Sequence, residues 1–127
     1  MEFDELSRSV IGCAIEVHRM LGPGLLESTY RKCLAYELSE AGISFQMELP
    51  LPVQYKGILL DCGYRIDLPV NGNLIVEIKS VETVLPIHHA QTLTYMRLAR
   101  VSVALLINFN VRKLQNGIKR CVLSESS

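Results

Sequence analysis

The sequence lacks an excess of charge of either sign. Its 127 residues include 13 basic and 13 acidic side chains, so the formal net charge is zero. Proteins that bind nucleic acid by electrostatic attraction are usually basic, and the balance taken alone argues against a general nucleic-acid-binding protein. A long apolar run that could span a membrane is also absent, and the acidic N-terminus predicts no signal peptide. We therefore expect a cytoplasmic protein that does not bind membranes.

Closely spaced cysteines are absent as well. The four cysteines lie far apart along the chain, at positions 13, 33, 62 and 121. Zinc sites and iron–sulfur clusters use cysteines that lie a few residues from one another, so neither is expected. A disulfide framework is not expected either, because such frameworks belong to secreted proteins. We predict free thiols in a reducing compartment.

The content of hydrophobic residues, 49%, is high enough for a folded core. A chain of this length suits one domain and leaves little room for two, so we expect a single domain over residues 1–127. The zero charge conceals an asymmetry, since residues 1–48 hold eight acids and four bases, whereas residues 97–127 hold one acid and six bases. A basic C-terminal third would suit a phosphate backbone, and the alternative is an ordinary solvated surface.

Hydrophobic periodicity and turn residues predict the order α-α-β-β-β-β-α-β-β. Such an order indicates an α/β fold with a mixed β-sheet flanked by helices. The expected helices cover residues 4–21, 25–41 and 86–100, and the expected strands cover residues 43–55, 58–62, 64–70, 74–81, 101–109 and 118–123.

The hairpin formed by residues 64–70 and 74–81 concentrates charge. A three-residue loop, 71–73, would pair residue 70 with 74, 68 with 76, 67 with 77 and 66 with 78, with Asn73 in the left-handed conformation. This register places Asp67 beside Glu77 across the two strands. One face would carry only apolar residues, namely Ile66, Leu68, Val70, Leu74, Val76 and Ile78, and the other face would carry Arg65, Asp67, Glu77 and Lys79.

Two adjacent carboxylates repel each other, and a hard cation between them would relieve the repulsion. Mg²⁺ typically takes one or two carboxylates together with waters and substrate phosphate. Lys79 lies two residues after Glu77 and would point to the same side, where an ammonium group could orient a water and stabilise phosphate charge. The alternative is a solvent-exposed sheet face on which Lys79 pairs with Asp67 or Glu77.

Three motifs give the chain a family resemblance. Asp67, Glu77 and Lys79 form a D-x9-E-x-K pattern, which resembles the PD-(D/E)XK nuclease superfamily, although Ile66 stands where the proline of that name would be. The segment 24–30 is similar to the G-x-x-E-x-x-Y signature of the GxxExxY family. The segment 91–95 is similar to the Q-x-x-x-Y motif of RecB-type nucleases, and it falls on the expected helix 86–100 as that motif requires.

The resemblance implies a restriction-endonuclease-like core and metal-dependent hydrolysis of phosphodiester bonds in nucleic acid, most often DNA. Mg²⁺ or Mn²⁺ would be held by Asp67, Glu77, Glu27 and the Ile78 carbonyl. The catalytic residues would be Asp67, Glu77, Lys79 and Glu27. The substrate-binding residues would be Gln91, Tyr95 and Tyr30, with Tyr30 also buttressing Glu27. The alternative is a catalytically silent protein with a nuclease fold that binds nucleic acid or acts as a scaffold. A domain of this size also suits a homo-oligomer or a complex with a partner protein.

Overall fold

The computed structural model describes residues 4–124, in which three α-helices occur close to their predicted positions. They are α1 (Glu5–Leu21), α2 (Glu27–Glu40) and α3 (Pro86–Ala99). The Asp4 side chain caps α1 by accepting a hydrogen bond from the Ser7 amide at 2.8 Å. Pro86 is the first residue of α3, where its missing N–H costs nothing. None of these helices is long and apolar enough to cross a membrane.

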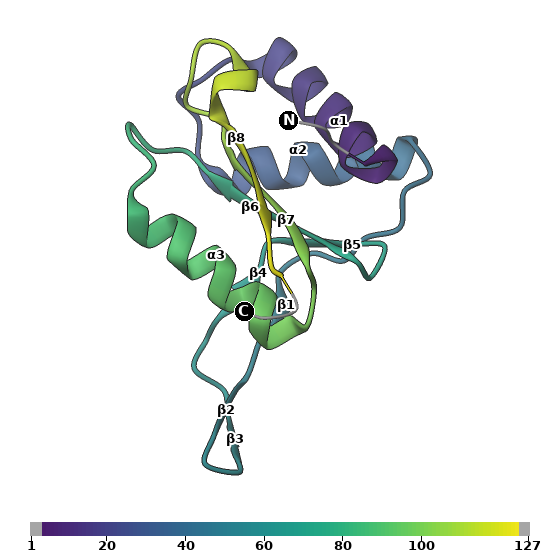
Figure 1. Ribbon diagram of the computed structural model, residues 1–127. Coiled ribbons are helices and arrows are strands. Elements are labelled where there is room, and N and C mark those ends of the chain that lie inside the picture. The colour runs from purple at the N-terminus through teal and green to yellow at the C-terminus, as the bar shows by residue number, and fades with distance from the viewer. Residues whose placement is uncertain (1–3, 125–127) are drawn as a thin grey trace.

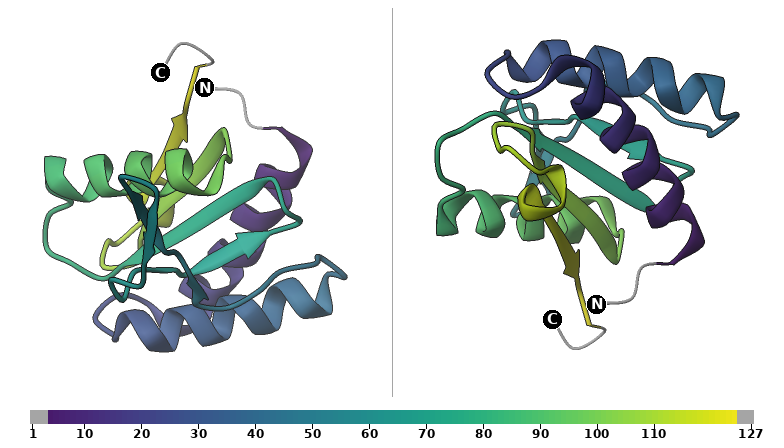
Figure 2. Two further views of the ribbon diagram at one scale, coloured as in Figure 1. Left: turned by 90° about the horizontal axis from the view of Figure 1, so that it is seen from below. Right: turned by 90° about the horizontal axis from the view of Figure 1, so that it is seen from above.

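The central feature is a four-stranded mixed sheet with the strand order β5-β6-β7-β8. Strands β6 and β7 run parallel, and the outer pairs are antiparallel. Helices α1 and α2 lie on one face and α3 lies on the other (Figures 1 and 2). The strands are β1 (Leu49–Pro50), β2 (Val53–Tyr55), β3 (Ile58–Leu60), β4 (Arg65–Ile66), β5 (Leu68–Val70), β6 (Leu74–Lys79), β7 (Val103–Asn108) and β8 (Ile118–Val122). The predicted α/β fold with a mixed sheet between helices is confirmed.

Both faces of the sheet are covered by apolar side chains. The alternation along β6 sends Val76 and Ile78 toward α1 and α2, where they pack in a cluster with Tyr30 and Phe109. Ile75 points the other way, into a second cluster beneath α3. The face that carries Glu77 is therefore not the solvent-exposed sheet face that the sequence left open as an alternative. It has an apolar core of its own, and Glu77 is buried at the edge of that core.

The predicted register of the hairpin is confirmed near the loop and ends at Leu68. Val70 pairs with Leu74 and Leu68 pairs with Val76, as expected for a three-residue loop. The predicted pairs 67–77 and 66–78 do not form, because the ladder stops before Asp67. Side chains replace the missing backbone bonds, since the Asp67 amide donates to Glu77 Oε1 at 3.2 Å and the Ile78 amide donates to Asp67 Oδ2 at 2.8 Å.

Two further expectations for this hairpin are wrong. Ile66 does not share a face with Leu68, because the chain is interrupted at Asp67 and Ile66 packs under α3 instead. In the loop, the left-handed conformation is taken by Asn71 and Gly72 and not by Asn73. The Asn73 amide donates to the Val70 carbonyl at 3.2 Å, so the tight turn is centred one residue earlier than predicted.

The expected strand 43–55 is divided. Only β1 and β2 form within it, and Glu48 before β1 has a positive φ of 51°. Pro50 and Pro52 lack backbone N–H groups, which prevents a continuous ladder through this segment. Strands β2 and β3 pair only with each other and form an arm that projects from the body of the molecule (Figure 1).

Substitution of two glycines by alanine should change the stability of the fold in opposite directions. A Cβ at Gly117 would overlap the Asn108 carbonyl oxygen, whereas a Cβ at Gly12 in α1 would meet nothing within 4 Å. We expect Gly117→Ala to lower the free energy of unfolding by about 1–3 kcal/mol. Gly12→Ala should raise it by about 0.5–1 kcal/mol, because alanine is the better helix former. Urea unfolding followed by circular dichroism measures both, and equal effects of the two changes would contradict the packing at Gly117.

Candidate active site

Asp67 lies where the hairpin ladder breaks, between β4 and β5. Its Oδ2 accepts the Ile78 amide, and its backbone amide reaches the Glu77 carboxylate. The predicted proximity of Asp67 and Glu77 is therefore present, although the two residues are joined by the hydrogen bond from the Asp67 amide to the Glu77 carboxylate and not by a ladder pair. The Asp67 side chain is 16% exposed, so the carboxylate remains within reach of a ligand.

Glu77 is the buried member of the pair, with 5% of its surface exposed. Burial raises the pKa of Glu77 well above its usual value, and the neighbouring charge of Asp67 raises it further, whereas Lys79 lowers it. Within residues 4–124, no salt bridge engages Glu77. Its negative charge is therefore poorly compensated, and a cation beside this pair would stabilise it.

Lys79 ends β6 and is half-buried, with its positive charge close enough to lower the pKa of Glu77. Glu27, the first residue of α2, lies at the same end of the strand. Its Oε2 accepts the amide of Ser80, the residue after Lys79, at 3.3 Å. The Ser80 hydroxyl donates to the Leu25 carbonyl at 2.5 Å. These two bonds fasten the segment before α2 to the end of β6 and bring Glu27 near that end of the strand.

Helix α3 places Tyr95 against the carboxylates from the other side. Burial raises the pKa of Tyr95, and the charges of Glu77 and Asp67 add to the shift, so its hydroxyl is protonated and lies near them. The ring also meets Tyr64 edge-on, with 5.9 Å between ring centroids. Gln91 lies one turn earlier on the same helix and is half-buried. The two polar residues of the Q-x-x-x-Y motif thus belong to the helix that covers Glu77.

The position of Tyr30 corrects its assignment to substrate binding. Its side chain is fully buried and stacks on Phe109, with 4.5 Å between ring centroids. The hydroxyl donates to the Gly22 carbonyl at 2.5 Å and accepts the Leu25 amide at 3.2 Å. Tyr30 therefore holds the loop that leads into Glu27, which agrees with a supporting role and excludes direct contact with a substrate in this structure.

The sequence motifs missed Arg31, which lies one helical turn after Glu27 on α2. Its Nη1 donates to Asp67 Oδ1 at 3.0 Å, and its Nη2 lies 3.2 Å from Glu48 Oε1. The Arg31 side chain is only 14% exposed. The i, i+4 spacing from Glu27 is the one signal in the sequence that places Arg31 on the site side of the helix.

Asn108 was missed as well. Its side chain is buried, accepts the Val81 amide at 3.1 Å and donates to the Val81 carbonyl at 2.9 Å. It ends β7 directly beside Lys79, its parallel partner in the sheet. Asn108 thus fixes the chain that leaves the site, and a polar residue at the end of a buried strand was the signal for it.

The basic residues of the C-terminal third do not gather at the site. Arg97 and Arg100 line a hollow at the C-terminal end of α3, whereas Lys119 lines another beside Asn108. Lys113 lies near the end of α1, next to His18. These bases are therefore divided among separate parts of the surface, which agrees with the alternative of an ordinary solvated surface.

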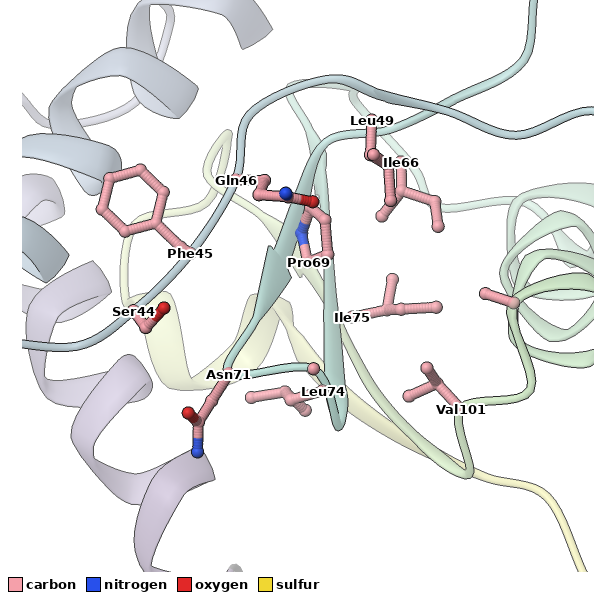
Figure 3. A pocket seen from close by; sticks show the side chains of 12 residues that line it. Ser44, Phe45, Gln46, Leu49, Ile66, Pro69, Asn71, Leu74, Ile75 and Val101 are labelled. Carbon is pink, nitrogen blue, oxygen red and sulfur yellow. The ribbon is translucent and has the colours of Figure 1, made fainter.

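An apolar hollow of about 360 Å³ lies beyond β5 and contains none of the predicted site residues. Figure 3 shows Phe45, Leu49, Ile75 and Val101 around it, together with the polar side chains of Gln46 and Asn71. Its lining has no titratable group. The titratable residues of the candidate site, Asp67, Glu77 and Lys79, lie elsewhere, around the end of β6.

The donor chemistry at this place fits a hard divalent cation. Mg²⁺ is typically bound by one or two carboxylates, with waters and substrate oxygens completing its six ligands. Asp67 and Glu77 supply two adjacent carboxylates, and the poorly compensated charge of Glu77 favours such an ion. In the part of the chain that is described, no three His, Cys, Asp or Glu side chains form a metal-binding group on their own. Glu27 is therefore not grouped with the other two carboxylates.

Comparison with known proteins agrees with this geometry. A family model described as the PD-(D/E)XK nuclease superfamily matches residues 4–121, which include all three helices and every site residue named above. A search of curated proteins found no match, and a search of solved structures found none either. With a carboxylate pair and a lysine set on a mixed sheet between helices, and with this match along nearly its whole length, the chain belongs to the PD-(D/E)XK nuclease superfamily.

Proposed function

We propose that the protein is a single-domain nuclease that hydrolyses phosphodiester bonds of nucleic acid, DNA foremost, with Mg²⁺ or Mn²⁺. Its D-x9-E-x-K, G-x-x-E-x-x-Y and Q-x-x-x-Y motifs further suggest a GxxExxY protein of RecB type. The observation that carries the proposal is the contact between the buried Glu77 carboxylate and Asp67, with Lys79 two residues further along β6. Membership of a superfamily that consists chiefly of nucleases supports the same activity.

Each site residue has a role in this proposal. Asp67 and Glu77 would hold the cation together with the Ile78 carbonyl, and Glu27 would assist through water. When bound, the cation supplies Lewis-acid stabilisation of the charge that develops on the phosphate oxygens. Lys79 orients the attacking water and stabilises the same negative charge. Gln91 and Tyr95 line the site and contact the substrate, and the Tyr95 hydroxyl stays protonated because burial and the nearby negative charges raise its pKa.

The test is cleavage of linear, circular and single-stranded DNA and of RNA, with Mg²⁺ or Mn²⁺ and with a chelator. We expect cleavage that requires the metal and that falls about 100-fold or more in Lys79→Met, the effect typical of a lost proton-handling group. Lys32→Met is the matched control, because Lys32 is an exposed lysine of α2. It should cleave at the wild-type rate.

Two results would count against this function. Absence of cleavage by the wild-type protein on every substrate would contradict the nuclease proposal. Equal cleavage by wild type and Lys79→Met would assign the activity to a contaminant or to another site. Binding of nucleic acid without cleavage would favour the alternative, a silent nuclease-fold binding protein, for which the ion pair between Arg31 and Asp67 is the supporting observation.

We also propose that the protein acts in the cytoplasm. Its four cysteines are all free, although Cys13, Cys33 and Cys121 are at least partly buried and Cys62 is exposed. Free thiols of this kind suit a reducing compartment. A homo-oligomer or a partner protein remains part of the proposal for so small a nuclease, and sedimentation velocity at several protein concentrations measures the first.

A further inference from the structure

Arg31 already occupies a carboxylate that the proposed chemistry assigns to a cation. Its guanidinium lies between Asp67 Oδ1 and Glu48 Oε1, at 3.0 and 3.2 Å. The other oxygen of Asp67 accepts the Ile78 amide, so both oxygens have partners in the absence of metal. A divalent ion that approaches Asp67 therefore meets a positive charge at short range, and like charges repel most strongly where little solvent screens them.

The two partners of Arg31 differ in how firmly they hold it. The Asp67 side chain is 16% exposed, whereas the Glu48 side chain is 56% exposed and lies at the surface. The Arg31 Nε is buried and has no hydrogen-bond partner among the described residues. A buried donor without a partner is rare, so Nε keeps a hydrogen-bonding capacity that an approaching acceptor would fill. The guanidinium thus has one strong contact, one weak contact and an unused donor.

The chemistry of the guanidinium suggests that acceptor. Its planar set of donors matches the oxygens of a phosphate, to which Nε and one Nη can donate together. The phosphate backbone of a substrate must come close to Asp67 for cleavage to occur there. Arg31 would then have an anionic partner to replace Asp67 once a metal ion takes that carboxylate.

We infer that Arg31 is a resident counter-cation that couples metal binding to substrate binding, an inference that rests on the proposed nuclease function. Without metal, Arg31 neutralises Asp67 and weakens the affinity of the site for divalent ions. When a metal ion binds Asp67, the guanidinium moves to a backbone phosphate of the nucleic acid. Metal and nucleic acid consequently bind with positive cooperativity, and each raises the affinity for the other by the same factor.

The test measures Mn²⁺ binding by titration calorimetry or electron paramagnetic resonance, so it does not depend on activity. Arg31→Gln should bind Mn²⁺ about 10-fold more tightly than wild type without nucleic acid, a change worth about 1.4 kcal/mol. In wild type, a phosphorothioate oligonucleotide that resists cleavage should raise Mn²⁺ affinity about 5-fold or more, within the usual range of such coupling. In Arg31→Gln this increase should disappear.

Controls separate this effect from loss of structure and from failure of the metal site. Arg19→Gln removes an arginine from an exposed ion pair with Glu16 and should leave Mn²⁺ affinity unchanged. Arg31→Lys keeps the charge and should bind Mn²⁺ like wild type, but with weaker coupling to the oligonucleotide because the planar donors are lost. Circular dichroism and thermal unfolding establish that each variant is folded.

The outcomes distinguish this inference from the proposed function. If Arg31→Gln is folded and binds Mn²⁺ no more tightly than wild type, while Asp67→Asn abolishes binding, the counter-cation role is wrong and the metal site stands. If Mn²⁺ binding is the same in Asp67→Asn as in wild type, the ion binds elsewhere and both ideas fail. If only Arg31→Gln binds Mn²⁺, Arg31 blocks the site, which supports the role and counts against a metal-dependent wild-type nuclease.

Discussion

Substitution of Asp67 by asparagine is expected to lower kcat/KM for nucleic-acid cleavage by at least about 1,000-fold, equivalent to about 4 kcal/mol of transition-state stabilisation. Asparagine keeps the size of the side chain and one oxygen, so it can still accept the Ile78 amide. It loses the negative charge that would bind the cation. The loss of activity should therefore appear without loss of the fold.

The matched control for this prediction is Asp61→Asn. Asp61 is 79% exposed and lies in the loop after the projecting β2–β3 arm, where its only ion pair with another residue of 4–124 is a long one to Arg65 at 3.9 Å. Its substitution should leave cleavage within about twofold of wild type, because exposed pairs contribute little. Cleavage by Asp67→Asn at the wild-type rate, with the control unchanged, would exclude Asp67 from catalysis.

Sequence reasoning predicted well wherever local chemistry determines the structure. The starts of the expected helices 4–21 and 86–100 and the three-residue loop between Val70 and Leu74 all follow from residues close together in the chain. Burial of one hairpin face then fixed the register as far as Leu68. The α/β fold with a mixed sheet followed from the order of elements alone.

The same reasoning failed where contacts come from distant parts of the chain. Whether the ladder continues through Asp67 depends on the Glu77 side chain, which takes the Asp67 amide away from the backbone. The burial of Tyr30 depends on Phe109, and the position of the Arg31 guanidinium depends in part on its ion pair with Glu48. No periodicity in a single segment contains this information. Local patterns thus found the carboxylate pair and the lysine but not the arginine that pairs with Asp67.

Substitution of Glu77 by glutamine is expected to stabilise the metal-free protein while it abolishes activity. Burial and the charge of Asp67 raise the pKa of Glu77, so ionisation of this group opposes folding. Glutamine stays neutral and its Oε1 still accepts the Asp67 amide. We expect the Tm at neutral pH to rise by about 3–5 °C, the shift that about 1 kcal/mol produces in a domain of this size. Cleavage should fall about 1,000-fold.

The sign of the pH dependence follows from the same shift. The unfolded chain releases the Glu77 proton near its ordinary pKa of 4.5, whereas the folded protein retains that proton to higher pH. The folded state therefore binds more protons across this window, and the stability due to Glu77 is complete below about pH 4.5 and is lost as pH rises through the folded-state pKa. The gap in Tm between Glu77→Gln and wild type should widen over that window, and Glu82→Gln, at an exposed residue, should show no such gap.

Divalent metal should reverse the order of the Tm values of wild type and Glu77→Gln. A ligand that binds only the folded state raises its stability, so Mg²⁺ should raise the Tm of wild type and leave that of Glu77→Gln almost unchanged. The unfavourable charge pair in the metal-free protein is then the feature that creates affinity for the ion. Differential scanning calorimetry at pH 7 with a chelator and with Mg²⁺ measures both states. A Tm for Glu77→Gln below that of wild type in the chelator would mean that the Glu77 charge is already well compensated, and the physical reason for a cation at this site would be lost.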